Sequence, residues 1–109
     1  MTYQELANLC LEFDGTYEDH PFGDDNSVIR HKEGKRKMFV LVIDWSGVPC
    51  INLKLPPMEG EFLQEQFKSI APAYHMNKIH WVTVRTDGDV SLELLKSLIK
   101  KSYDLTNRR

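Results

Sequence analysis

The segment from Tyr74 to Trp81 gathers side chains that could hold phosphates and stack on exposed bases. Its polar and aromatic members are Tyr74, His75, Asn77, Lys78, His80 and Trp81. Lysine and asparagine side chains contact phosphate oxygens, and tyrosine or tryptophan rings offer flat faces to bases. A structural role stays open, because Trp81 alternates with Ile79 and Thr83 as a core residue would, and the polar residues could stabilise a loop.

A second candidate site is the basic stretch Lys35-Arg36-Lys37, with Lys32 and Arg30 close to it in the sequence. Gly34 supplies the positive φ that a tight turn needs, so we expect these cations at the tip of a hairpin. A protruding basic hairpin resembles a wing that follows a phosphate backbone. The alternative is that lysines on an edge strand discourage aggregation between sheets and bind nothing.

The charge of the chain is divided unevenly, although the formal net charge is only -2. Residues 1–29 hold seven of the 16 acids and none of the 14 Lys and Arg. The remainder therefore carries nine acids and a formal balance of +5. This asymmetry favours a basic face that could attract nucleic acid, while ordinary solvation of both charge sets is the alternative.

Catalytic and metal-binding patterns are missing from the sequence. It contains no G-x-S-x-G elbow, no phosphate-cradling glycine loop and no H-E-x-x-H pair. Cys10 and Cys50 lack the close paired spacing of a zinc site, and we expect both to be buried thiols. His75 and His80 could share a metal only if His20 or His31 converged on them. We expect no enzyme activity, no cofactor and no metal.

Helical periodicity marks the two ends of the chain. Thr2 and Glu5 form a capping box that opens a helix. Its apolar stripe comprises Leu6, Leu9, Cys10 and Phe13, and Asp14-Gly15 ends it. An acidic loop extends from there to Asn26. Ser91 caps a final helix, whose stripe comprises Leu92, Leu95, Ile99 and Tyr103.

The middle of the chain alternates in the manner of strands. We expect an edge strand over Ser27 to Lys32, a central strand over the apolar run Met38 to Ile43, and a third strand around Ile51, Leu53 and Leu55. A short helix over residues 58–68 follows Pro56-Pro57, and a further strand covers residues 79–85. The pattern predicts an α+β fold with two layers, an antiparallel sheet packed with helices on one face, in the order α-β3-α-β(1-2)-α.

Composition places the chain among ordinary globular proteins. With 109 residues, 41% of them hydrophobic and 28% charged, it has the size and balance of one domain, which we expect to cover residues 1–109. The start of the chain lacks the apolar run of a signal peptide, and no stretch approaches the ~20 apolar residues that span a bilayer. We therefore expect a cytoplasmic protein that makes no membrane contact.

The block Ala73-Tyr74-His75-Met76-Asn77-Lys78-Ile79-His80-Trp81-Val82-Thr83-Val84 resembles the MmcQ/YjbR family. Further matches are Pro21-Phe22-Gly23, Lys37-Met38-Phe39, Asn52-Leu53-Lys54, Asp87-Gly88 and Ser102-Tyr103-Asp104-Leu105. The resemblance implies a small domain in the order α-β3-α-β2-α, also described as double-wing or secretion-chaperone-like. Members are commonly labelled DNA-binding proteins by analogy of fold.

The resulting hypothesis is weak, salt-dependent DNA binding through the basic hairpin and the loop segment. The proposed contact residues are Lys35, Arg36, Lys37, His75, Asn77, Lys78, His80 and Trp81. The alternative is a protein-interaction module, chaperone-like or self-associating, that binds another protein or a second copy and no nucleic acid.

Overall fold

The computed structural model describes residues 1–107, which form three helices and a six-stranded antiparallel sheet. The helices are α1 (Tyr3–Leu11), α2 (Pro57–Gln66) and α3 (Leu92–Thr106). The strands are β1 (Thr16–Asp19), β2 (Asn26–His31), β3 (Met38–Trp45), β4 (Val48–Lys54), β5 (Ile70–Pro72) and β6 (Trp81–Arg85). Their order across the sheet is β1-β2-β3-β4-β6-β5. The predicted α+β class is confirmed.

Both terminal helices begin where the sequence predicts. The Thr2 hydroxyl accepts a hydrogen bond from Glu5 N (3.1 Å), and the Glu5 carboxylate accepts one from Thr2 N (2.8 Å), which completes the capping box of α1. The Ser91 hydroxyl accepts from Leu94 N (3.1 Å) at the start of α3. Each cap pairs backbone N–H groups that the first helical turn would leave without partners.

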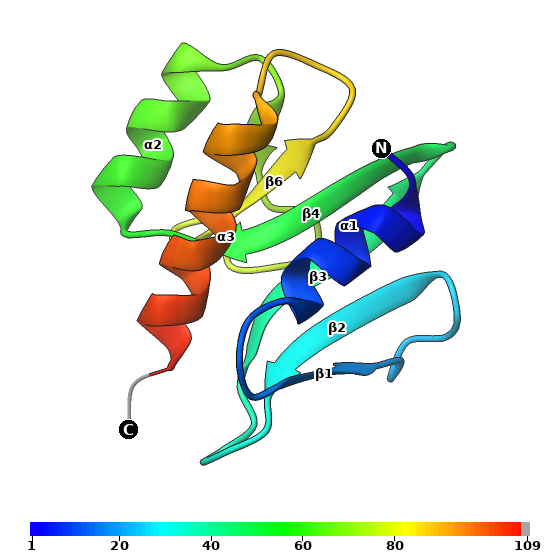
Figure 1. Cartoon of the computed structure of the whole chain (residues 1–109). Helices are drawn as coiled ribbons and strands as arrows, with labels where there is room; N and C mark the ends of the chain where they lie inside the picture. The colour runs from blue at the N-terminus through cyan, green and yellow to red at the C-terminus, as the bar shows by residue number, and fades with distance from the viewer. Residues whose placement is uncertain (108–109) are drawn as a thin grey trace.

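Alternation along the strands separates the sheet into two faces. Figure 1 shows α1 and α3 lying in front of the central strands, and α2 adds Leu63 to the same core. The strand residues that pack under the helices are Ile29, Val40, Val42, Ile51, Leu53, Val82 and Val84. Neighbouring positions such as Leu41 and Ile43 point to the opposite face, because successive side chains of a strand alternate.

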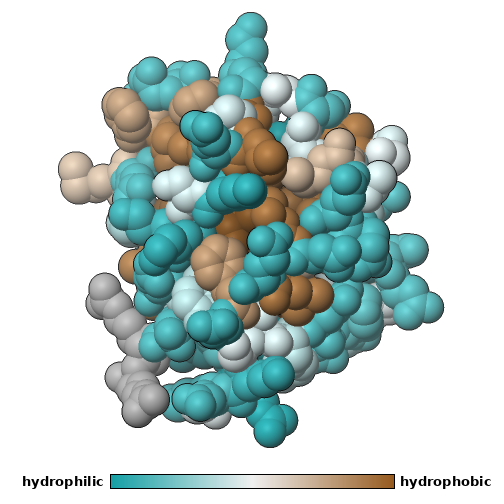
Figure 2. Space-filling view, viewed as in Figure 1, coloured by the Kyte–Doolittle hydropathy of each residue, from teal (hydrophilic) through white to brown (hydrophobic). Residues whose placement is uncertain are grey.

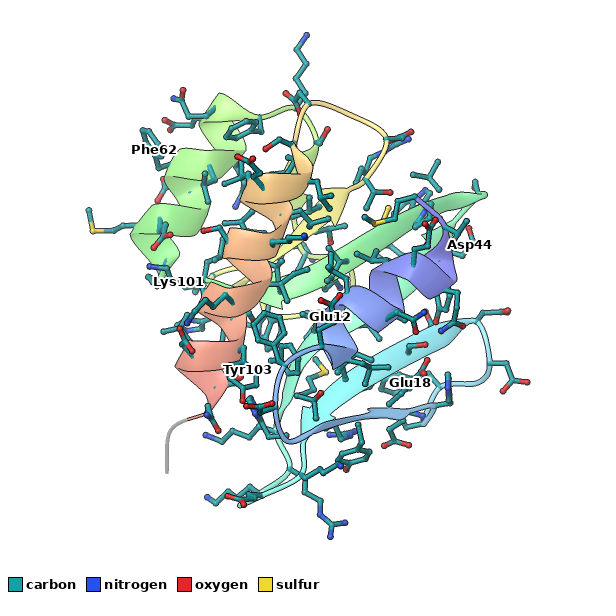
Figure 3. All side chains as sticks on the ribbon, viewed as in Figure 1. Glu12, Glu18, Asp44, Phe62, Lys101 and Tyr103 are labelled. Carbon is teal, nitrogen blue, oxygen red and sulfur yellow. The ribbon has the colours of Figure 1, made fainter. Side chains whose placement is uncertain are left out.

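Ser102 joins α3 to the two central strands. Its buried hydroxyl donates to Phe39 O (2.5 Å) and accepts from Lys54 N (2.8 Å), at the end of the β3–β4 ladder. The next residue of α3, Tyr103, labelled in Figure 3, donates to Asp14 O (2.6 Å) and stacks on Phe13 with ring centroids 4.9 Å apart. These contacts attach α3 to the sheet and to the turn that follows α1.

Two details of the strand prediction are wrong. The segment 16–19, expected within an acidic loop, forms β1, which pairs with β2 through Thr16↔His31 and the three following positions. The strand predicted over 27–32 is consequently an inner strand and not an edge. Glu18 and Asp19 lower the intrinsic strand propensity of β1, and pairing with β2 overrides it: the Ser27 hydroxyl donates to Glu18 Oε2 (2.5 Å) and Arg30 pairs with Asp19.

Other turns and elements follow the sequence closely. Gly34 has φ +64° in the β2–β3 turn, and Ser46 and Gly47 both have positive φ in the β3–β4 turn. The sequence left one or two strands open between α2 and α3, and the structure has two, β5 and β6. Among residues 1–107, no helix combines the length and apolar character that a bilayer crossing requires.

Candidate ligand-binding cleft

A cleft of about 720 Å³ lies on the sheet face that the helices leave uncovered. Met38, Leu41 and Ile43 of β3 form its apolar floor, with Arg30 beside them on β2 and Asn52 on β4. Leu41 and Ile43 are half-buried, whereas Val40 and Val42, which alternate with them along β3, are fully buried under the helices. The uncovered sheet face is therefore apolar and accessible at its centre.

A closed set of hydrogen bonds fixes the loop that forms one wall. The hydroxyl of buried Thr83 donates to Asn52 Oδ1 (2.5 Å) and accepts from Tyr74 N (3.2 Å), while Asn52 Nδ2 donates to Tyr74 O (3.2 Å). Both backbone groups of Tyr74 are thus bound by two neighbouring strands, since Asn52 and Thr83 are cross-strand partners. The wall is held in place without any ligand.

Aromatic rings border the cleft. Phe22, Trp45 and Tyr74 are 68%, 44% and 49% exposed, although such rings are usually buried. The Trp45 and Tyr74 rings meet edge to face with centroids 4.7 Å apart, and the His75 ring lies 3.8 Å from that of Tyr74. These rings form an accessible aromatic surface above the apolar floor.

Backbone strain is concentrated around the same cleft. Among residues 1–107, the non-glycine residues with positive φ are Arg36 (54°), Ser46 (52°) and His75 (60°). Ser46 and His75 line the cleft, and the carbonyl of Arg36 accepts a hydrogen bond from Arg30 in its wall. Such conformations cost free energy and are retained where the surrounding structure over-determines them, often at functional sites.

The charged groups differ between the two ends of the cleft. Arg30 stands at the end nearest the β2–β3 hairpin and pairs with Asp19 (3.0 Å). At the other end, the Asp44 carboxylate accepts from Gly47 N (2.8 Å) inside the β3–β4 turn (Figure 3), and exposed Asp24 and Asp25 follow Phe22. One end therefore presents a cation and the other end is surrounded by acids.

The helix side carries a smaller hollow. Figure 2 shows apolar surface at the centre of this side, between hydrophilic side chains. Leu9, Phe13 and Ile99, with Glu12 and Lys96, line a hollow of about 210 Å³ between α1 and α3. This volume lies below the several hundred Å³ typical of small-molecule sites, so the cleft on the uncovered face is the stronger candidate.

The thiols of the chain have no activating surroundings. Burial raises the pKa of both Cys10 and Cys50, so each thiol is protonated at neutral pH. The prediction that both are buried is confirmed, and neither forms a disulfide. Within residues 1–107, the structure places no group of three or more His, Cys, Asp or Glu side chains where they could hold a metal ion.

The structure distributes the DNA-contact residues predicted from the sequence over several places. Lys35 and Lys37 line a hollow beside the end of α3, with Arg36 between them at the hairpin tip, and all three are exposed. Lys78 and His80 line a separate hollow beside α2.

The remaining predicted residues lie apart from both hollows. His75 borders the aromatic cleft. Asn77 Oδ1 accepts a hydrogen bond from Ile79 N (2.9 Å) within its own turn. Trp81 of β6 is half-buried and lies opposite Lys54 of β4. The set therefore does not form one contiguous site, and its role in DNA contact stays a prediction.

A family model described as YjbR matches residues 11–105. The chain belongs to the YjbR family. This confirms the resemblance seen in the sequence. The protein YbdF of Escherichia coli O157:H7 is 42% identical over 103 residues, covering 94% of this chain and 82% of that protein. YyaQ of Bacillus subtilis is 28% identical over 120 residues, covering 97% and 98%. Both relatives carry the name uncharacterized protein.

Solved structures of other proteins share the fold. The Deinococcus radiodurans protein DR2400 superimposes with a TM-score of 0.88 at 38% identity, covering 99% of this chain and 80% of that one. A Pseudomonas syringae protein gives a TM-score of 0.87 at 32% identity, covering 98% and 100%. The arrangement of helices and strands is thus common to chains that differ at most positions.

Several cleft residues of this YjbR domain were not predicted as site residues from the sequence. The sequence predicts a loop at Phe22 and a central strand over Leu41 and Ile43, and it gives Trp45 no role in a site. Asn52 offered a signal, because it is a polar side chain between Ile51 and Leu53 in the middle of a strand. Its partner Thr83 is distant in sequence, so only the register of β4 against β6 reveals the pair.

Proposed function

We propose that this YjbR-family domain is a binding protein whose small-molecule ligand occupies the cleft on the uncovered sheet face. The observation that carries the proposal is the combination of a cleft of about 720 Å³, an apolar floor and a wall fixed by the buried Asn52–Thr83 pair. Sites for small molecules are usually concave, largely apolar, pre-formed and a few hundred to a thousand Å³ in volume.

The exposed rings support binding at this place. Phe22, Trp45 and Tyr74 come from three separate segments, yet all border one cleft. Exposed apolar groups that gather around a hollow favour a ligand, because covering them removes apolar area from water. Binding is favoured over catalysis because burial raises the pKa of both thiols, and within residues 1–107 no hydrogen bond joins the Ser46 or Tyr74 hydroxyl to His75 or Asp44.

A fragment screen followed by amide NMR tests the proposal. We expect planar apolar fragments at millimolar concentration to shift the amides of Asn52, Tyr74 and His75 and the indole N–H of Trp45. The amides of Leu9 and Phe13, in the helix-side hollow, should stay unchanged and serve as the internal reference. If no fragment moves the cleft resonances, the proposal is wrong.

A matched pair of variants localises the effect. Phe22 borders the cleft and is 68% exposed, whereas Phe62 on α2 is 57% exposed and lies outside it. Phe22→Ala should weaken fragment binding severalfold, because a ring contact contributes about 0.5–1.5 kcal/mol. Phe62→Ala removes a similar exposed ring and should leave fragment binding unchanged. Equal losses in the two variants would indicate nonspecific adsorption to exposed rings.

A second candidate function is DNA binding through the β2–β3 hairpin, supported by the three consecutive exposed cations Lys35, Arg36 and Lys37. Three phosphate contacts would give weak binding with a slope of about -3 in log affinity against log salt. Fluorescence anisotropy with labelled DNA measures this slope. Charge reversal at Lys35 and Arg36 should abolish binding, whereas reversal at exposed Lys96 on α3 should not; a slope near zero would contradict this candidate.

A further inference from the structure

Arg30 is the cation in the wall of the aromatic cleft. It projects from β2 toward the cleft beside Met38, its cross-strand partner, and its side chain is only 28% exposed. Its Nε donates to Asp19 Oδ2 (3.0 Å) and its Nη1 donates to Arg36 O (3.3 Å). Two acceptors of the protein thus orient the guanidinium at one end of an apolar floor.

Hydrogen-bonding capacity remains on this guanidinium. Arginine carries five N–H donors, and within residues 1–107 the bonds of Arg30 involve Nε and Nη1 while Nη2 has no partner. A partly buried arginine that keeps unbonded N–H donors can donate charge-assisted hydrogen bonds to a carboxylate. Arg30 lines the same cleft as the exposed rings, so an anionic group and a flat ring system could be held together.

Resting on the proposed function, we propose that the ligand is a planar aromatic carboxylate. Its ring lies on Leu41 and Ile43 against the rings of Tyr74 and Trp45, and its carboxylate accepts hydrogen bonds from Arg30. The length of the floor along β3, from Met38 to Ile43, separates the anionic end of the ligand from its apolar end.

The surrounding charges orient this ligand in one direction. At the far end of the cleft, Asp44 lines the wall and would repel a carboxylate, and exposed Asp24 and Asp25 precede the lining residue Asn26 in the sequence. Among the described lining residues, Arg30 is the only Lys or Arg. Asp19 competes for the Arg30 guanidinium, but its side chain is 42% exposed and is therefore partly satisfied by water. The carboxylate accordingly binds at the hairpin end.

Three probes of the same shape test the inference: naphthoate, naphthylmethanol and naphthylmethylamine, each substituted at the same ring position. Binding is measured by quenching of Trp45 fluorescence in a Trp81→Phe background and by the cleft amide shifts. We expect naphthoate to bind about tenfold more tightly than the alcohol, since a charge-assisted bond is stronger than a neutral one, and the amine to bind most weakly.

Variants on both sides of the Arg30 pair should act in opposite directions. Arg30→Gln should remove the preference for naphthoate over the alcohol, and Asp19→Asn, which frees the guanidinium, should increase it. Arg85→Gln is the matched control, because Arg85 pairs with Asp87 (2.9 Å) in the same sheet outside the cleft, and it should change nothing. Asp19→Asn keeps the inference testable if Arg30→Gln fails to fold.

The outcomes separate this inference from the proposed function. Equal binding of the three probes, a preference for the amine, or a naphthoate preference that survives Arg30→Gln would overturn the carboxylate assignment while the cleft remains a binding site. Cleft shifts from other fragments with none from naphthoate would do the same. Absence of cleft shifts with every fragment would overturn the proposed function itself.

Discussion

The two faces of the sheet carry similar apolar residues but differ in how deeply these residues are buried. Val40, Val42, Ile51 and Leu53 point under α1 and α3 and are fully buried. Leu41 and Ile43, which alternate with Val40 and Val42 along β3 and are of the same chemical type, point away from the helices and are only half-buried in a cleft. The helix-covered face explains stability, whereas the apolar character of the uncovered face has no partner in the fold and is the main reason to expect a ligand there.

Substitution of the same residue type on opposite faces gives the largest contrast. Ile51→Ala creates a cavity in the fully buried core and should lower the free energy of unfolding by about 2–5 kcal/mol. Ile43→Ala, next to Val42, the cross-strand partner of Ile51, changes a side chain on the uncovered face and should cost only about 1 kcal/mol because that side chain is partly exposed. Urea unfolding measures both. Similar losses would show that the uncovered face carries core packing.

Ser102→Ala tests how the helix layer is fastened to the sheet. The change removes a hydroxyl that bridges Phe39 O and Lys54 N in a fully buried position, and it should cost about 2–3 kcal/mol in urea unfolding. Ser97→Ala, one exposed serine on the same helix, is the control and should be neutral. A loss below about 0.5 kcal/mol for Ser102→Ala would mean that water replaces the bridge.

Thr83→Val tests the corresponding fastening on the uncovered face. It leaves Tyr74 N and Asn52 Oδ1 without their partner, and we expect a loss of about 1–2 kcal/mol, less than for Ser102 because Tyr74 is half-exposed and can bind water. Hydrogen exchange at the Tyr74 amide should accelerate. Thr83→Ser keeps the hydroxyl and should retain slow exchange of the Tyr74 amide. Equal exchange rates in the two variants would contradict a stabilising hydrogen bond from Tyr74 N to the Thr83 hydroxyl.

The smallest expected effect is the pH dependence of stability that His31 causes on the helix-covered face. Burial, followed by the charge of Lys37, lowers the pKa of His31, which hydrogen-bonds to Thr106 Oγ1 (2.8 Å). The unfolded chain therefore binds a proton more readily than the folded one, so stability is complete above the ordinary pKa of about 6.5 and falls as pH decreases below it.

The size of this loss is bounded by the titration of one proton. Between about pH 7 and about pH 6 it should not exceed about 0.7 kcal/mol. Urea unfolding of the native chain and of His31→Gln, which keeps an N–H donor but does not titrate, should show the slope in the first and its loss in the second. An unchanged slope in His31→Gln would assign the effect to another group.

The difference between the faces explains why the fold was more predictable than the site. The capping residues Thr2 and Ser91, the apolar stripes of the terminal helices and the run Met38–Ile43 act over a few neighbouring positions, so their signals are local. The strand β1 was missed because its pairing with β2, nine to fifteen positions away, outweighs the low strand propensity of its acidic residues.

The sequence by itself determined the layered α+β arrangement, the burial of the helix-facing residues and the family. These features could be predicted because periodicity and short motifs depend only on residues that are close together in the sequence. The cleft was decided only by tertiary structure. Phe22, Trp45 and Tyr74 come from three separate segments and line the same cleft. Asn52 lies opposite Thr83 because of the register between β4 and β6. Contacts between residues twenty to fifty positions apart depend on how distant segments are placed in the tertiary structure, and no local sequence pattern specifies this placement.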